Sequence, residues 1–367
     1  MRTKGWLAIT LLLNASAAAA SPREAPEPQT ARSFGSVAED TTFSVRQGQR
    51  LLIDNFAGDV HVMAWGKDAI RLATSHSRRT RIDIESSASE VQISSHGHMG
   101  PGSAEMDLSV PHWMPIQVQG VQTDISIEGS RGEVKAQTVH GDIQLVGGGN
   151  FVSLSSVDGA VKVVGARGRV QVSSVNDGVE LNDVVGDISA ESVNGNVVLV
   201  RSDSKSIEAS TINGGVLFDG QTQRGGVYTF STHNGDILVG LPDKPDVSVS
   251  VSTFGGNFST FLPIQLSETR KHKPITFVLG SGNAQLELES FQGSIRLEKL
   301  GAALQRAWER TQSGEEDAEE AVVRKAKEKA RESQFKFHFE NAKTKKDKDK
   351  NGEDSDKDED PDHEEDR

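Results

Sequence analysis

The chain has 367 residues, of which 5% are aromatic, 36 are glycine and none is cysteine, and its formal net charge at pH 7 is −13. This composition argues against a bulky aromatic core and favours many short strands and turns. The lack of cysteine excludes disulfides and a lipid-anchored N-terminal cysteine, and the negative charge without a basic, aromatic-rich face argues against nucleic-acid binding.

Residues 1–20, "MRTKGWLAITLLLNASAAAA", combine a basic start, a short apolar run and small residues at the end. This pattern predicts a secretory signal peptide that is cleaved after Ala20. No other segment approaches the roughly 20 apolar residues of a membrane helix, so we expect no integral membrane span after signal removal. Residues 21–41 are rich in proline and small polar residues, which predicts a flexible leader.

Residues 42–299 alternate apolar and polar side chains with a period of two, as in strands, and the alternation is interrupted by regularly spaced glycines. Glycine recurs at intervals of 17 to 21 residues, which is the signature of a repeat architecture. The recurring positions are Gly141, Gly159, Gly178, Gly195, Gly214, Gly235 and Gly256.

Each repeat contains two strands with a corner between them. Alternating triplets such as Val170, Val172 and Ser174 precede the glycine, and pairs such as Val197 and Leu199 follow it. A single repeat cannot bury its apolar side chains, whereas stacked repeats enclose a continuous core. We therefore predict an all-β fold, a parallel β-solenoid (β-helix) with coils of about 18–21 residues.

Two polar columns fall at the predicted corner. Threonine or serine ends each triplet and points inward, so we expect its hydroxyl to satisfy backbone groups at the bend. Asparagine, aspartate or histidine precedes each glycine and is expected to form the turn and to bond to its neighbours. Ligand binding is the alternative role for these columns, but a structural role is favoured because buried polar groups normally have partners.

The serial units "TVHGDI", "SVDGAV", "SVNGNV", "TINGGV" and "THNGDI" resemble the bacterial adhesin-like β-strand-repeat family, also called the toastrack domain. "LLIDNFAGDVHVMAWG", "LSVPHWMPIQVQGVQTDISIEG" and the closing "GSGNAQLELESFQGSIRL" extend the resemblance from Leu51 to Leu297. The resemblance implies a β-solenoid in an exported or envelope-associated protein, and it brings no catalytic residues. His112, Trp113 and Met114 depart from the charged residue that often follows the family's "VP".

The composition changes after Leu297. Residues 300–339 predict helices, of the kind found in coiled coils, in which Leu300, Leu304 and Trp308 share one face and could close the open end of the solenoid. Residues 340–367 are acidic and almost devoid of apolar side chains, which predicts a disordered tail.

An apolar stripe is expected on the outer side of the second strands, because the alternation leaves several apolar residues facing away from the core. Such a stripe should be covered by the C-terminal helices or by a partner protein. The stripe comprises Val164, Val198, Val200, Leu217 and Leu238, and the helical contact face comprises Leu304, Trp308, Val322 and Ala326.

Two segments contain possible metal ligands. Imidazole and thioether groups of the kind that bind Cu(I) lie between residues 96 and 114, and a calcium-loop spacing lies in the tail. Ordinary loop and tail residues explain both patterns better, and we assign no metal or cofactor. The residues concerned are His96, His98, Met99, Met106, His112 and Met114 in the first segment, and Asp347, Asp349, Asn351, Gly352 and Asp358 in the second.

The outward positions of the first strands are mostly serine and glutamine, and no paired-carboxylate or Ser-His-Asp motif recurs. The sequence therefore indicates a non-enzymatic, adhesin-like interaction or scaffold module, exported to the periplasm or cell surface, with an envelope protein or surface polysaccharide as its partner. The alternative is a carbohydrate-binding or carbohydrate-cleaving β-helix. In-register aromatic residues or clustered charges on the outer surface would favour that alternative.

Overall fold

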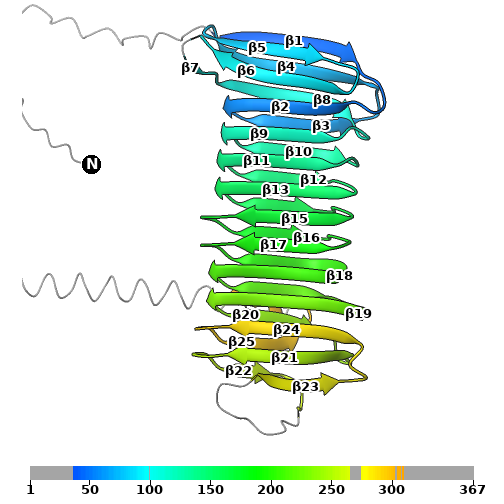
Figure 1. Ribbon diagram of the computed structural model, residues 1–367, viewed down its shortest axis with the longest axis vertical. Helices are drawn as coiled ribbons and strands as arrows, with labels where there is room; N and C mark the ends of the chain where they lie inside the picture. The colour runs from blue at the N-terminus through cyan, green and yellow to red at the C-terminus, as the bar shows by residue number, and fades with distance from the viewer. Residues whose placement is uncertain (1–35, 99, 265–273, 302–303, 307, 310–367) are drawn as a thin grey trace, which may run out of the picture.

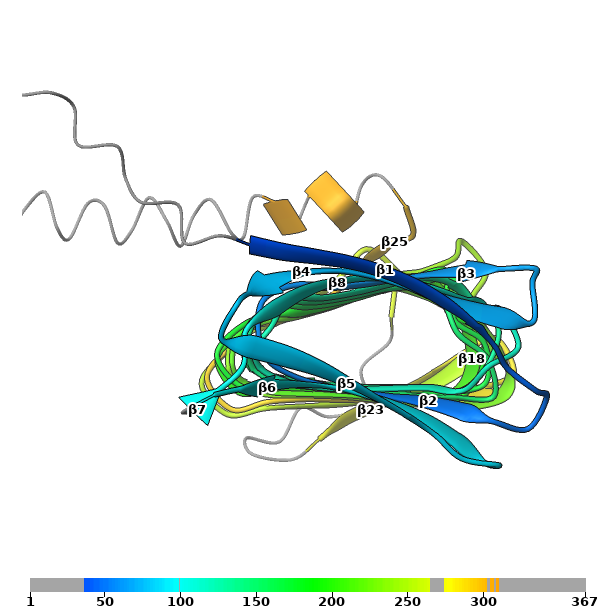
Figure 2. The same cartoon turned by 90° about the horizontal axis from the view of Figure 1, so that it is seen from above.

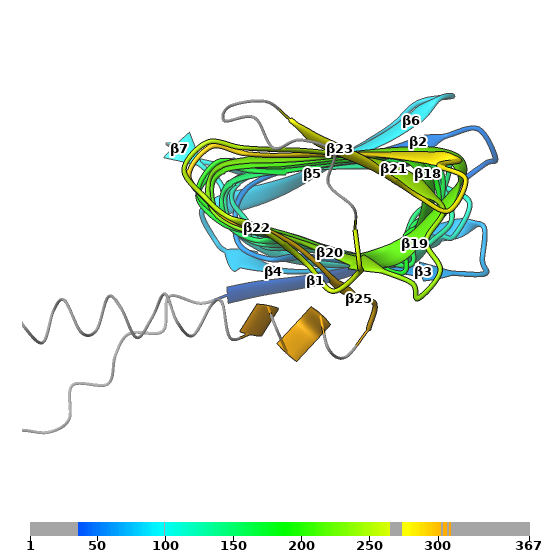
Figure 3. The same ribbon diagram turned by 90° about the horizontal axis from the view of Figure 1, so that it is seen from below.

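The computed structural model describes residues 36–98, 100–264, 274–301, 304–306 and 308–309. Its strands stack one above another along the long axis of the molecule (Figure 1). Seen along that axis, they form two layers that face each other, here called layer A and layer B (Figures 2 and 3). The predicted all-β class with mainly parallel strands is confirmed.

Layer A holds the first strand of each repeat, and adjacent strands within this layer run parallel to each other. In stacking order it comprises β6 (Glu90–Gly97), β2 (Arg50–Ala57), β9 (Ile116–Gln122), β11 (Val134–His140), β13 (Phe151–Asp158), β15 (Arg169–Ser174), β17 (Ile188–Ser192), the second halves of β18 (Val197–Asn213) and β19 (Val216–Asn234), then β24 (Ala284–Ser290) and β21 (Val247–Thr253).

Layer B holds the second strand of each repeat, again in parallel. In stacking order it comprises β8 (Ala104–Pro111), β3 (Val60–Trp65), β10 (Ile125–Ser130), β12 (Ile143–Gly147), β14 (Val161–Val164), β16 (Val179–Asn182), the first halves of β18 and β19, then β20 (Ile237–Leu241), β25 (Ile295–Lys299) and β22 (Phe258–Thr260).

Antiparallel strands flank the two layers near the ends of the stack. At the N-terminal end, β4 (Ala69–Ser77) pairs with β8 and β1 (Ser36–Ser44), while β5 (Thr80–Ser86) and the short β7 (Gly100–Pro101) pair with β6. At the C-terminal end, β23 (Ile275–Leu279) pairs with β21. Reversing the strand direction ends the repeat pattern on these edges.

The register follows the repeat read from the sequence. Val134 pairs with Val152, Val152 with Val170, and Val170 with Ile188, so residues 18 positions apart lie side by side. The offset grows to 19 residues between Ile188 and Ile207. Layer B keeps the same offsets, so each inward column contains equivalent residues of successive repeats.

The core lies between the two layers and is built mainly from valine, isoleucine and leucine. The alternation of strands such as β11, with burial at every second residue, puts these side chains on the inner face. The largest fully buried side chains are Phe218, Tyr228 and Phe230, and they pack together. The ring centroid of Phe218 lies 5.8 Å from that of Tyr228 and 5.1 Å from that of Phe230. Small aliphatic residues suffice because the space between the layers is narrow.

The order of strands at the C-terminal end differs from the order expected from the sequence. The triplet of Val249 was expected to stack directly on the triplet of Tyr228, but β24 lies between them and pairs with both β19 and β21. The chain therefore returns to insert its last repeat into the stack. The two candidate strands carry the same alternation of apolar side chains, so hydrophobic pattern alone does not distinguish them.

The first strand also begins earlier than predicted. β1 starts at Ser36, inside the segment 21–41 that was predicted as a flexible leader. It is an edge strand paired only with β4, and most of its side chains are exposed. Without a buried face, "SVAEDTTFS" shows no apolar alternation, which is why its sequence did not indicate a strand.

A carboxylate introduced at an inner position of a strand should destabilise the fold, whereas one introduced at the neighbouring outer position should not. Val152 is fully buried, whereas its neighbour Ser153 faces outward beside Lys135. We expect Val152→Asp to lower the free energy of unfolding by several kcal/mol, because an unpaired carboxylate would enter the core, and Ser153→Asp to leave it nearly unchanged. Thermal denaturation followed by circular dichroism measures both, and equal melting temperatures would refute the assignment of the two faces.

The corner glycines should not tolerate a methyl group. A Cβ on Gly159 would lie 2.0 Å from the carbonyl oxygen of Gly141 in the neighbouring repeat, whereas a Cβ on Gly66 would meet nothing within 4 Å. We expect Gly159→Ala to destabilise the fold by about 1–3 kcal/mol, since the stacked backbones must separate. Gly66→Ala is the control and should be neutral in urea denaturation; a neutral Gly159→Ala would show that the corner is loosely stacked.

Candidate functional site

Buried hydroxyl groups hold the corner at which each layer A strand leads into layer B. Thr138 Oγ1 donates a hydrogen bond to the carbonyl oxygen of Thr123 at 2.9 Å, and Ser174 Oγ donates to that of Gly159 at 2.8 Å. The same bond recurs at Ser156, Ser192, Thr211, Thr232, Thr253 and Ser290. The predicted structural role of this column is confirmed, because each of these hydroxyls already has a backbone partner.

A ladder of polar side chains runs along the outside of the same corner. The amide nitrogens of Asn194, Asn213 and Asn234 each donate to the amide oxygen of the preceding ladder residue at 2.8 to 3.0 Å, and that of Asn176 donates to the carboxylate of Asp158. His140 Nδ1 lies 2.7 Å from Asp158 Oδ2 at the other end. In order, the ladder comprises His140, Asp158, Asn176, Asn194, Asn213 and Asn234. Its asparagine part carries no charge.

Next to this ladder lies an apolar row that we call the corner ridge. One residue of each repeat points outward at the corner, in six repeats between the buried hydroxyl and the ladder residue, and the strand registers and corner hydrogen bonds align these residues. In stacking order the corner ridge comprises Phe56, Val121, Val139, Val157, Val175, Val193, Ile212, His233, Phe291 and Phe254.

The corner ridge is exposed at eight of its ten positions, and Val121 and Val193 are half-buried. Val157 and Val175 are 39% and 38% exposed, and Ile212 is 49% exposed. Single exposed apolar residues are common on protein surfaces, but nine apolar residues in register over ten repeats, interrupted by His233 alone, are not, and such patches mark interaction sites.

The C-terminal end of the corner ridge is aromatic. The rings of His233 and Phe291 stack with centroids 4.7 Å apart, and those of Phe291 and Phe254 stack at 5.1 Å, nearly parallel in both pairs. Phe291 is thus covered on both faces by its neighbours. The stack adds cross-strand packing energy and places Phe254, 64% exposed, at its end.

The layer A side of the corner ridge carries few charges, whereas exposed aspartates such as Asp124, Asp142 and Asp177 lie beyond the ladder on its other side. On its layer A side, the outward residue two positions before each ridge residue is usually serine or glutamine. In stacking order these residues are Asp54, Gln119, Gln137, Ser155, Ser173, Glu191, Ser210, Ser231, Glu289 and Ser252. The ridge and its layer A side can therefore exclude water against a partner without desolvating many charges, which is what a protein interface needs at its centre.

The sequence reasoning did not identify the corner ridge. Its signal is present in the units "TVHG", "SVDG", "SVNG" and "TING", where valine or isoleucine always stands between the hydroxyl and the ladder residue. The corner needs no apolar side chain there, because the residue points to solvent. An apolar residue repeated at an outward position is the feature that would have revealed the surface.

The possible copper ligands between residues 96 and 114 do not converge. Met106 and Met114 are fully buried in the core, and His112 Nδ1 lies 2.8 Å from the carbonyl oxygen of Trp65. His96 lies on β6, 3.4 Å from Asp83. His98 is exposed, and Met99 lies outside the described residues. Within the described part of the chain, no three histidine, aspartate or glutamate residues are grouped as metal ligands would be.

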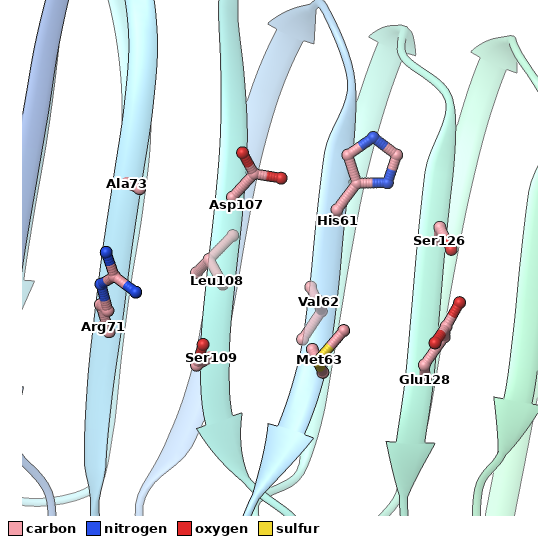
Figure 4. A pocket seen from close by; sticks show the side chains of 10 residues that line it. All are labelled: His61, Val62, Met63, Arg71, Ala73, Asp107, Leu108, Ser109, Ser126 and Glu128. Carbon is pink, nitrogen blue, oxygen red and sulfur yellow. The ribbon is translucent and has the colours of Figure 1, made fainter.

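An open hollow of about 440 Å³ lies on the outer side of layer B, across β4, β8, β3 and β10 (Figure 4). Asp107, His61 and Ser126 lie side by side on three adjacent strands, in the order of a Ser-His-Asp triad. However, no hydrogen bond joins the three within the described structure, and the backbone N–H groups around them are engaged in the sheet. The row therefore lacks both the activated nucleophile and the oxyanion donors of such a site.

The cation of this hollow, Arg71, is paired with a carboxylate from outside it. Arg71 Nη2 lies 2.6 Å from Asp40 Oδ2 on β1, and hydrogen bonding to this guanidinium lowers the pKa of Asp40 below its usual value. The hollow thus offers an open surface of mixed polar and apolar side chains, and among the described residues its polar groups are not joined into a catalytic set.

A second hollow, of about 540 Å³, lies where the C-terminal segment meets β18 and β19. Asp219, only 6% exposed, accepts a hydrogen bond from the backbone N–H of Gly301 at 3.1 Å. Arg201 is held by Asp183 at 2.8 Å, and this hydrogen bond lowers the pKa of Asp183. The C-terminal segment therefore packs at the edge of this hollow, where Asp219 binds its backbone.

The described C-terminal residues cover part of the predicted apolar stripe. Leu304 is fully buried against Leu217 and Leu238, and Val198 and Trp308 pack around them. The predicted cover is confirmed for these residues, while Val164 remains 38% exposed. Leu304 thus lies on the outer side of layer B instead of closing the end of the stack, because the apolar side chains that accept it are there.

The remaining C-terminal predictions lie outside the described residues. They concern Val322, Ala326, the rest of the helical segment with its coiled-coil character, and the calcium-loop pattern of Asp347, Asp349, Asn351 and Asp358. The same holds for the signal peptide. Among the described residues, no helix is long and apolar enough to cross a membrane.

A charge beneath the C-terminal segment should release it. Leu304→Asp would place a carboxylate between Leu217 and Leu238, so we expect the segment to detach and the binding of a hydrophobic dye to rise. A chain truncated after Ala342 is the control and should bind no more dye than the parent. Unchanged dye fluorescence in Leu304→Asp would contradict the assigned packing.

Comparison with known proteins gives matches only among solved structures. No protein-family model and no curated protein sequence matches the chain. A "putative cell adhesion protein" from Clostridium sporogenes matches 72% of this chain and 100% of its own, with 11% identity and a TM-score of 0.20. A "putative adhesin" from Bacteroides fragilis matches 71% and 97%, with 10% identity and a TM-score of 0.35.

A further "putative adhesin", from Parabacteroides merdae, matches 71% of this chain and 96% of its own, with 8% identity and a TM-score of 0.40. At such identities and TM-scores, these matches carry no argument about function. The solved structures that the chain resembles are adhesin-like proteins by name, which agrees with the resemblance seen in the sequence.

Proposed function

We propose that this chain is a non-enzymatic, adhesin-like interaction module of the bacterial cell envelope, and that it binds a protein partner through the corner ridge. The single observation that carries the proposal is the row of nine apolar side chains and His233 in register along ten repeats, eight of these ten residues being exposed. An exported chain with a signal peptide reaches the periplasm or cell surface, where such a surface meets envelope proteins.

The apolar character of the corner ridge favours a protein partner. Valine and isoleucine side chains offer dispersion contacts and a hydrophobic driving force but no hydrogen bonds, so a partner must supply apolar groups of its own. Proteins do this with aliphatic and aromatic side chains, whereas a polysaccharide is mostly hydroxyl groups. The amide ladder beside the ridge supplies the polar rim that protein interfaces usually have.

The second candidate function is carbohydrate binding, which was the alternative from the sequence. The observation that favours it is the aromatic end of the corner ridge, where His233, Phe291 and Phe254 stand in register. Sugars stack on exposed ring faces, yet both faces of Phe291 are already covered. Carbohydrate binding would therefore depend on the end of the stack at Phe254, a much smaller surface than the whole ridge.

Binding to envelope vesicles of the source bacterium tests the proposal. The mature protein is immobilised on a biosensor, and vesicle binding is compared for the parent and for the double variant Val157→Lys, Ile212→Lys. We expect the variant to lose at least about tenfold in binding, because two charges would interrupt the apolar surface. Protease treatment of the vesicles should abolish binding, and periodate oxidation of their glycans should not.

The matched control is Val146→Lys, Val164→Lys. The exposed fractions of these valines, 47% and 38%, are similar to those of the ridge residues, but the two valines lie on the outer side of layer B. The control should bind vesicles as the parent does. Loss of binding after periodate but not protease treatment would favour the carbohydrate function, and equal binding by all variants would reject the corner ridge as the site.

A further inference from the structure

The spacing of the corner ridge limits which proteins can bind along its whole length. Its side chains repeat at the spacing of stacked strands, about 4.8 Å. A partner that contacts the whole row must present side chains at the same spacing over the same length. A second copy of this chain carries such a row. We propose that the partner of the corner ridge is a second copy of the chain, with the two ridges packed side by side.

This inference rests on the proposed function, because it uses the same surface, and it names the protein that the surface binds. Two copies that meet in this way form a closed pair with two-fold symmetry. On one cell the pair is a dimer, and between two cells it is an adhesive contact.

The charge distribution permits two copies to approach at this surface. The net charge of −13 makes copies repel over most of their surface. Along the middle of the corner ridge the repulsion is reduced, since the ladder residues from Asn176 to Asn234 are uncharged and the charges beside them are those of Asp177 and Asp236. On the layer A side, Glu191 is the one charged residue in the row from Gln119 to Ser231.

The size of the corner ridge is sufficient for a specific interface. Ten repeats span nine intervals, or about 43 Å at the strand spacing. A stable interface buries roughly 800 Å² on each partner, which a strip of this length reaches at a width of about 19 Å. Two layers about 10 Å apart, with side chains on each outer face, give the edge of the stack roughly that width.

The shape of the corner ridge favours an antiparallel arrangement. One end is bulky, with Phe291 and Phe254 in succession, and the middle consists of valines. Antiparallel ridges place Phe291 of one copy against Val121 of the other, as close packing of large against small side chains requires, and they bring Phe254 onto Phe56 instead of onto a second Phe254. This arrangement pairs Val175 with Val193, Val157 with Ile212, and Val139 with His233.

Sedimentation velocity of the purified mature protein at increasing concentration tests the pairing. We expect a monomer–dimer equilibrium, and we expect Val157→Lys, Ile212→Lys to raise the dissociation constant at least tenfold, since lysines would face lysines across the interface. The control Val146→Lys, Val164→Lys should dimerise as the parent does. A parent that stays monomeric at all concentrations, or a control that loses dimerisation equally, would overturn the proposal.

Cysteine cross-linking tests the orientation, and the absence of native cysteine makes it specific. A Val139→Cys chain mixed with a His233→Cys chain should form a disulfide-linked pair under mild oxidation, because disulfides need Cα atoms within about 7 Å. Val139→Cys alone should not cross-link, and neither should a Val146→Cys chain mixed with a Val164→Cys chain. Cross-linking of Val139→Cys with itself, or no ridge cross-link, would contradict the antiparallel pair.

The outcomes also separate this inference from the proposed function. A monomeric parent whose ridge variant still loses vesicle binding would leave the corner ridge as a binding site for a different protein. A dimer that binds no vesicles would support self-association alone. If truncation after Glu309 converts a monomeric parent into a dimer, the chain's own C-terminal region covers the ridge in the full-length protein, and the proposed pair is rejected for that form.

Discussion

The constraint on which this structure depends is the close stacking of backbone on backbone at the corner of each repeat. The glycine of one repeat lies directly over the carbonyl oxygen of another, so closely that a Cβ on Gly235 would fall 2.0 Å from the oxygen of Gly214. Because the backbones keep this spacing, equivalent side chains are aligned along the whole stack. The inward hydroxyls, the amide ladder and the corner ridge are three consequences of that alignment.

Alignment converts small local preferences into continuous surfaces. An asparagine before glycine is an ordinary turn residue, but in register it bonds to the asparagines above and below it. A valine beside it is an ordinary exposed residue, but in register it becomes one member of an apolar row about 43 Å long. Function in such a protein therefore belongs to columns of residues, and a single repeat contains too little of the surface to bind anything alone.

The features that could be predicted from the sequence are those that repeat. The alternation in "VQVSS" and the glycine spacing indicated inward and outward faces, the corner and the role of Ser174, because each follows from local geometry. The insertion of β24 between β19 and β21 could not be predicted, since Leu286 and Val249 carry equivalent patterns. The corner ridge was overlooked because apolar residues were assigned to the core, and β1 because an edge strand needs no apolar face.

The central claim is that the corner ridge, and no other exposed apolar surface, is the binding surface. Methyl NMR of the mature protein, labelled at valine and isoleucine, tests it directly as the protein concentration is raised or envelope extract is added. The account predicts shifts or broadening for Val157, Val175 and Ile212, with no change at Val146 and Val164, whose exposure is similar. Changes confined to the layer B valines, or none at the ridge, would contradict it.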